Sequence, residues 1–173
     1  VLCSLIFVLC SEATFYEVRG KISWENKVYS QVDAYLLYDK LTEYNSEQAT
    51  EISKGSPQRS FDEEYASLEK KSMIGTDNVS DKKEMKKTQK ELRHGLEGLI
   101  KQYRARSVSI NRKGEFYLNV SPDISYYILV LKKDALFAGD NHTRFWLYRI
   151  YFKPGDVLDA KEIIFNETNV MTW

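Results

Sequence analysis

The stretch that decides the fold is Phe15–Asp39, FYEVRGKISWENKVYSQVDAYLLYD. In Phe15–Trp24, every second residue from Tyr16 is apolar or glycine, and the residues between them are charged or polar. This period of two is typical of a half-buried β-strand. Gln31–Asp39 alternates in the same way, after the polar turn Glu25-Asn26-Lys27. The sequence therefore predicts two antiparallel strands joined by a short connection.

Strand patterns return near Ser107 and continue to the end of the chain. The predicted strands are Ser107–Asn111, Glu115–Val120, Ser125–Lys132, Arg144–Lys153 and Val157–Phe165. Turn signals separate them, and no strand–helix alternation occurs in this part. We expect Ser125–Lys132 to be central because it is the most apolar, whereas Arg144–Lys153 is largely apolar or aromatic on both faces. The fold class predicted is mainly β, a seven-stranded sandwich of immunoglobulin-like or transthyretin-like type.

A charged segment at about residues 42–106 separates the second and third predicted strands. Ser60 and Glu63 form a capping box, which marks the start of a helix. A second helix is predicted over Asp81–Arg104, with its apolar stripe formed by Met85, Leu92, Leu96, Leu99 and Tyr103. We expect a helical hairpin, with the stripe packed on the Arg144–Lys153 strand. Replacement of Leu41–Arg106 by a short turn is then expected to leave a folded sandwich.

The inserted segment is polarised in charge. Glu43–Glu69 holds seven acidic and two basic residues, and Lys82–Arg106 holds nine basic and three acidic. Antiparallel packing would place opposite charges side by side, with the outer face in solvent. The alternative is a docking arm whose basic helix contacts an anionic partner or surface.

The N-terminus indicates export. Val1–Leu9 is an uncharged apolar run, and the small residues Ser11 and Ala13 suit a signal-peptidase site. We therefore predict that residues 1–13 are part of a signal peptide and that residues 14–173 form one domain. A plain secretory signal is preferred over a lipoprotein signal, in which Cys10 would carry the lipid. Cys3 and Cys10 are the only cysteines, so the processed protein would have no disulfide and no cysteine ligand.

Composition narrows the function classes. The 173 residues are 43% hydrophobic, which supports a true core. Lys+Arg and Asp+Glu balance at 25 each, so nucleic-acid binding is not expected. No phosphate-binding glycine loop or nucleophile elbow occurs, and no cofactor is predicted.

Four motifs occur in a fixed order along the two strand-rich parts. They are Gly-x-Ile-x-Trp at Gly20–Trp24, Val-x-Ala-x-Leu-Leu at Val32–Leu37, Asn-Arg-Lys-Gly-Glu-Phe at Asn111–Phe116 and Tyr-Tyr-Ile-Leu at Tyr126–Leu129. This order resembles the carboxypeptidase regulatory-like, or transthyretin-like (prealbumin-like), β-sandwich. The resemblance covers about 90 of the 173 residues, rests on turn and strand signals, and excludes the helical insert. It implies a non-catalytic accessory or envelope module.

Two alternatives remain open beside that hypothesis. A small hydrolase or metal-dependent enzyme would use the Asp140–His142 loop, although the two histidines lack the spacing of a metal site. An adhesin-type domain would join Lys21 to Asn166 or Asn169 by an isopeptide bond. We predict no catalytic or metal-binding residue. Asn-x-Ser/Thr triplets, among them those at Asn78, Asn141 and Asn166, match the N-glycosylation sequon, which has no meaning in a bacterial source.

Aromatic side chains are the predicted binding residues, if any of them are exposed. The candidates for a ligand or partner are Trp24, Trp146, Tyr148 and Phe152. The function predicted from sequence is an exported binding or structural module in the periplasm, the cell envelope or the extracellular space. Its partner would be an unknown protein or carbohydrate at the cell envelope, with membrane contact only through a lipid anchor.

Overall fold

The structure is a computed structural model that describes residues 15–23, 32–40, 60–77, 82–121, 124–132, 143–152 and 161–173. The predicted signal segment, Cys10, Trp24 and the Asp140–His142 loop lie outside these residues. Two β-sheets and two α-helices make up the described part, which is mainly β.

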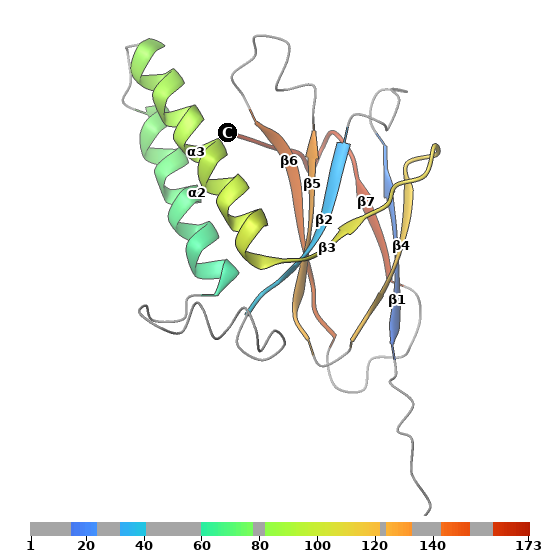
Figure 1. Ribbon diagram of the computed structural model, residues 1–173. Coiled ribbons are helices and arrows are strands. Elements are labelled where there is room, and N and C mark those ends of the chain that lie inside the picture. The colour runs from blue at the N-terminus through green and yellow to red at the C-terminus, as the bar shows by residue number, and fades with distance from the viewer. Residues whose placement is uncertain are drawn as a thin grey trace, which may run out of the picture.

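Eight strands form two sheets that enclose a common core (Figure 1). The three-stranded sheet has the order β4 (Glu115–Val120), β1 (Tyr16–Ile22), β7 (Lys161–Phe165). The five-stranded sheet has the order β3 (Arg104–Val108), β2 (Val32–Tyr38), β5 (Tyr126–Lys132), β6 (Arg144–Ile150), β8 (Met171–Thr172). As the sequence predicts, the apolar strand β5 is central in its sheet. The two-residue strand β8 was not expected.

The predicted hairpin between the first two strands is wrong. Strand β1 pairs antiparallel with β4 and parallel with β7, whereas β2 pairs antiparallel with β3 and β5. The alternation of apolar residues specifies which face of a strand is buried, but it does not specify the neighbouring strand. Both strands turn their apolar faces into the same core, from opposite sheets.

The core between the sheets depends on one close approach of backbone to ring. Gly20 of β1 lies opposite Phe116 of β4. A Cβ at Gly20 would lie 1.8 Å from Phe116 Cζ, so the glycine leaves the space that the ring fills. Phe116 is buried and stacks on Phe165 of β7, with 6.1 Å between the ring centroids. The glycine of the first sequence motif is therefore a packing requirement.

Two antiparallel helices, α2 (Phe61–Asp77) and α3 (Lys82–Tyr103), connect β2 to β3. The predicted capping box is present. Glu63 N donates to Ser60 Oγ at 3.3 Å, and Ser60 N donates to Glu63 Oε2 at 2.9 Å. The second helix ends within one residue of the predicted boundary. The ion pairs Lys87–Glu91 and Arg93–Glu97 lie within α3 rather than between the two helices.

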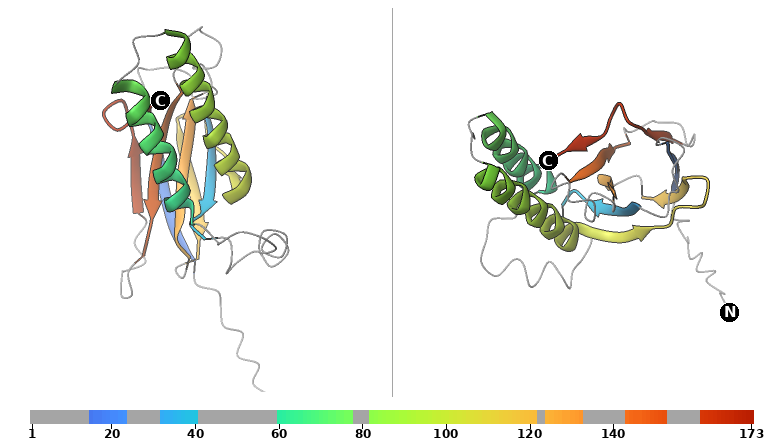
Figure 2. Two further views of the ribbon diagram at one scale, coloured as in Figure 1. Left: turned by 90° about the vertical axis from the view of Figure 1, so that its left-hand side faces the viewer. Right: turned by 90° about the horizontal axis from the view of Figure 1, so that it is seen from above.

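The helices cover the outer face of the five-stranded sheet as a third layer (Figure 2). A second core lies between them. Its buried members are Leu37, Phe61, Tyr65, Leu96, Leu99, Ile100, Tyr103, Tyr127, Leu129 and Phe145. Strand β6 contributes Trp146 and Ile150 to the first core and Phe145 to the second, which explains why both of its faces are apolar. The sequence predicts that the α3 stripe packs on this strand, but α3 instead contacts β2 and β3. Helix α2 lies against β6, where the ring of Tyr65 is edge-on to that of Phe145 with 6.4 Å between centroids.

The second core changes the expected result of removing the insert. Deletion of Leu41–Arg106 would remove both helices and the first three residues of β3. Leu37, Leu129 and Phe145, each 0% exposed, would then face water. Burial of one such side chain stabilises the fold by about 1.5–3 kcal/mol. The insert is therefore part of the folding unit, and a folded sandwich is no longer the expected product of that deletion.

Candidate functional site

A charged cluster lies where the start of α2 meets the five-stranded sheet. Arg149 of β6 bridges two carboxylates, with Nη2 donating to Asp39 Oδ2 at 3.0 Å and Nη1 donating to Asp62 Oδ2 at 3.3 Å. The side chain of Asp39 is only 7% exposed, whereas those of Arg149 and Asp62 are 48% and 53% exposed. A buried carboxylate of this kind requires a cation and hydrogen-bond donors. The guanidinium supplies both.

Tyr127 of β5 completes the cluster. Its hydroxyl donates to Asp62 Oδ1 at 2.5 Å, and the Arg149 guanidinium carbon lies 5.6 Å from the centroid of its ring. Burial raises the pKa of Tyr127 well above its ordinary value, and the hydrogen bond to Asp62 adds to this effect. The phenol therefore stays protonated at neutral pH and acts as a hydrogen-bond donor.

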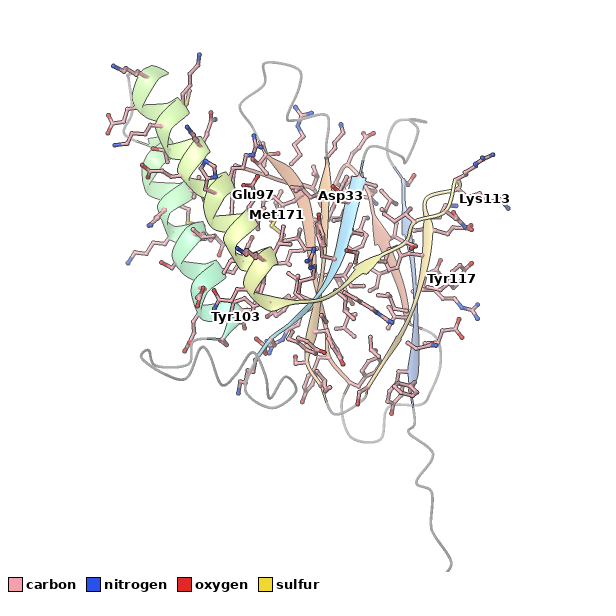
Figure 3. All side chains as sticks on the ribbon, viewed as in Figure 1. Asp33, Glu97, Tyr103, Lys113, Tyr117 and Met171 are labelled. Atoms are coloured by element: carbon pink, nitrogen blue, oxygen red, sulfur yellow. The ribbon has the colours of Figure 1, made fainter. Side chains whose placement is uncertain are left out.

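A second tyrosine–carboxylate pair lies at the last turn of α3 (Figure 3). The hydroxyl of Tyr103 donates to Glu64 Oε1 at 3.0 Å, and Gln102 Nε2 donates to the same oxygen at 3.3 Å. Burial, followed by the hydrogen bond to Glu64, raises the pKa of Tyr103. These bonds join the end of α3 to the first turn of α2.

The cluster fixes the helices on the sheet, because its polar groups mostly satisfy one another. Phe61 N donates to Asp39 O at 2.8 Å, so the backbone after β2 holds the first residue of α2. The exception is Asp39 Oδ1, which is buried without a hydrogen-bond partner. Within the described residues, no group of three or more His, Cys, Asp or Glu side chains is placed to bind a metal ion. The cluster therefore has a structural role, because it holds α2 against the five-stranded sheet.

Sequence reasoning missed this cluster. Arg149 stands on a strand face that is otherwise apolar, and Asp39 ends the first strand-rich stretch. Taken alone, neither residue indicates a buried ion pair. The bond between them joins residues 110 positions apart. The signal that could have found it is the position of Arg149, which alternates with the apolar residues Phe145, Leu147 and Tyr151 on one face of the strand.

Three of the predicted binding aromatics can be placed. Trp146 is 1% exposed, and its Nε1 donates to the Asn166 carbonyl at 2.7 Å, so it is a core residue and its assignment to an exposed binding cluster is wrong. The reason is that the inner face of β6 is needed by the first core. Tyr148 and Phe152 are half-buried and pack against that core, and the Phe152 ring stacks on Tyr16 with 4.2 Å between centroids. Trp24 lies outside the described residues.

The residues of the proposed crosslink lie on β1 and in the turn that follows β7. Lys21 is exposed on the outer face of β1. Asn166 and Asn169 lie in the turn after β7, where Asn169 Nδ2 donates to the Ile164 carbonyl at 2.8 Å. The side-chain oxygen of Asn166 is engaged within the same turn.

A different surface is exposed at the end of the helical hairpin. We define the hairpin tip as the exposed residues near the α2–α3 connection. They are Lys70, Lys71, Met73, Lys83, Glu84, Met85, Lys86, Lys87 and Lys90. The five residues 83–87 are all exposed, and at 3.6 residues per turn they cover every side of the helix. From Gln89 onward the inward side chains of α3 are buried. This first part of α3 is therefore not seated on the sheet.

The comparisons with known proteins assign no relative. No protein-family model matches the chain, and neither a curated protein nor a solved structure shows significant similarity to it. Among the described helices, none is long and apolar enough to cross a membrane.

Proposed function

We propose that this protein is an exported, non-catalytic β-sandwich module that binds an acidic protein partner through the hairpin tip. Export rests on the apolar segment Val1–Leu9 and the small residues that follow it. The module would act in the periplasm, the cell envelope or the extracellular space. The exposed, lysine-rich start of α3 is the observation that carries the binding proposal.

Strand grouping supports the transthyretin-like form of the sandwich over the immunoglobulin-like form. In the immunoglobulin sandwich the first two strands share a sheet. Here β1 lies with β4 and β7, and β2 lies with β3, β5, β6 and β8. The parallel pairing of β1 with β7 also places the first strand beside a late strand in the smaller sheet, apart from β2. The chain would be such a sandwich with two helices inserted between β2 and β3.

A non-catalytic role is supported by the use of the polar groups. The best-connected titratable cluster, around Arg149, holds α2 against β5 and β6. Tyr127 in this cluster and Tyr103 beside it have raised pKa values and so remain protonated at neutral pH. A protonated tyrosine donates a hydrogen bond that stabilises the fold, whereas a general base or nucleophile needs a pKa near the working pH. Function would then depend on surface recognition.

The charge of the hairpin tip favours an acidic partner. Six of its nine residues are lysines and one is a glutamate. Two exposed methionines, Met73 at 60% and Met85 at 37%, lie among them. Methionine adapts to varied apolar surfaces, and lysines attract carboxylates at long range. An acidic protein segment that carries a few apolar side chains would satisfy both properties.

The test measures binding of the full chain to immobilised polyglutamate at several salt concentrations. The tip variant Lys83→Glu/Lys86→Glu/Lys87→Glu is compared with Arg112→Glu/Lys113→Glu, a reversal at the exposed turn on the far side of the molecule (Figure 3). We expect the parent and the Arg112/Lys113 variant to bind at low salt, and the tip variant to bind at least about tenfold more weakly.

Two outcomes would contradict the proposal. Equal binding of the two variants would show that the tip is not the site. Preferential binding of the parent to a sulfated polysaccharide or to anionic vesicles, with no affinity for polyglutamate, would replace the acidic protein by another partner class. Circular dichroism of each variant checks that the helices are retained.

A further inference from the structure

The turn that follows β7 contains a sequon, Asn166-Glu167-Thr168. Here Asn166 Oδ1 accepts two hydrogen bonds, from Thr168 N at 2.9 Å and from Thr168 Oγ1 at 2.6 Å. These bonds use only the side-chain oxygen of Asn166. They also place the Thr168 hydroxyl beside the Asn166 carboxamide, which is the group that a sequon offers for modification.

The side-chain nitrogen of Asn166 remains available. Within the described residues no hydrogen bond engages Nδ2, and the one described side-chain atom that is both buried and unpartnered is Asp39 Oδ1. Asn166 Nδ2 is therefore not fully buried, and Asn166 as a whole is half-buried. Glu167, Thr168 and Asn169 are exposed, so the turn leaves room around this nitrogen.

The backbone of the turn is anchored independently of that nitrogen. Trp146 Nε1, in the core, donates to the Asn166 carbonyl at 2.7 Å. Asn169 Oδ1 accepts from Asn166 N at 2.8 Å, and Asn169 Nδ2 donates to Ile164 O at 2.8 Å. A substituent on Asn166 Nδ2 would break none of these bonds. The folded turn can therefore carry a large group at this one atom.

We propose that Asn166 is an N-glycosylation site. The inference rests on the proposed export of the chain, here through a secretory pathway that contains an oligosaccharide transferase. The donor would be a lipid-diphosphate-linked oligosaccharide. Asn166 Nδ2 attacks the first sugar carbon, the bond from that carbon to the diphosphate oxygen breaks, and the lipid diphosphate leaves. One amide proton passes to a base of the transferase, and nothing is oxidised or reduced.

The position gives the attached sugar a physical consequence. Strand β7 is the edge of the three-stranded sheet, and Asn166 directly follows it. An open strand edge can pair with another chain. Asn169 Nδ2 already donates to the Ile164 carbonyl on β7, and the side chain of Ile164 is 51% exposed. A hydrophilic oligosaccharide beside this edge would add to the protection against intermolecular pairing.

The test expresses the full chain behind a cleavable signal peptide of a eukaryotic host. Asn78→Gln, Asn119→Gln and Asn141→Gln are introduced, the second because Asn119-Val120-Ser121 is also an Asn-x-Ser triplet, so that Asn166 is the only sequon. Chains inside microsomes, identified by resistance to added protease, are digested and mapped by mass spectrometry before and after treatment with a glycan-releasing amidase. We expect the Asn166 peptide to carry an oligosaccharide and to contain aspartate at position 166 after release.

Matched variants distinguish the site from general effects on folding or export. Thr168→Ser and Glu167→Gln keep the sequon and are expected to keep the sugar, whereas Thr168→Ala and Asn166→Gln are expected to lose it. Unmodified Asn166 in the protease-protected chains would overturn the inference while leaving export intact. Modification that persists in Thr168→Ala would also overturn it. Because the host signal peptide supplies entry into microsomes, these results do not depend on whether the native N-terminal segment directs export.

Discussion

Two glycines on α3 provide a matched test of how closely the helices pack. Gly98 faces open space, because a Cβ built there meets no atom within 4 Å. Glycine in a helix interior costs about 1 kcal/mol relative to alanine. The substitution Gly98→Ala is therefore expected to stabilise the protein by about 1 kcal/mol.

Gly95→Ala makes the same chemical change three residues earlier, at the contact with α2. A Cβ there would lie 2.5 Å from Leu68 Cδ2 and 3.0 Å from Leu68 Cδ1. The gain in helix propensity is again about 1 kcal/mol. Overpacking costs about 1–3 kcal/mol, since Leu68 has to move. The net effect is expected to lie between about zero and 2 kcal/mol of destabilisation, taking the difference of these two terms.

Urea unfolding followed by circular dichroism measures both variants. In thermal unfolding of a protein of this size, Gly98→Ala should raise Tm by about 2–4 °C. In the Gly95→Ala background, Leu68→Ala should cost less than it does alone, because it removes the clash. Equal stabilisation by the two glycine substitutions would refute the close approach of α2 and α3 at this point.

Three further predictions concern the cores and the charged cluster. Gly20→Ala should destabilise the protein by about 3 kcal/mol, at the upper end of overpacking costs, because a Cβ would lie 1.8 Å from the Phe116 ring; Phe116→Leu should recover part of the loss in urea unfolding. Arg149→Met should cost about 3 kcal/mol, because it leaves the Asp39 carboxylate buried without its cation. Asp62→Asn should cost less than about 1 kcal/mol, because that carboxylate is 53% exposed. The free energy of unfolding should also fall as pH rises above about 10, because tyrosines of the unfolded chain begin to ionise there while the folded pKa values are higher. Below that pH the tyrosines should cause no change in the free energy of unfolding. Single Tyr→Phe variants should reduce the fall. The tyrosines with raised pKa are Tyr65, Tyr103 and Tyr127.

Local patterns predict most elements of this fold because their causes are local. The period of two in Glu115–Val120 and the capping box at Ser60 each depend on residues within a few positions. The partner of each strand depends on closure of a common core, so the pairing of β1 with β7 could not be read from either strand.

The charged cluster was unpredictable for a related reason. Asp39, Asp62 and Arg149 come from three distant parts of the chain, and only Arg149 is unusual in its own segment, as a charge on an otherwise apolar strand face. The exposed tip of the hairpin differs, because its charge is a local property. The sequence could therefore identify a basic helix but could not show which part of it is seated on the sheet.

The two halves of α3 follow different constraints. From Gln89 to Tyr103 its inward side chains are buried, and from Leu96 onward they lie in the second core, which covers the outer face of the five-stranded sheet. Residues 83–87 are exposed and belong to neither core. Replacing their lysines by other polar residues would therefore leave both cores intact. Packing therefore accounts for the second half of the helix and leaves the charge of the first half unexplained. The proposed binding role for the hairpin tip would supply the missing reason, because a fold that needed only to cover its sheet could begin α3 near Thr88.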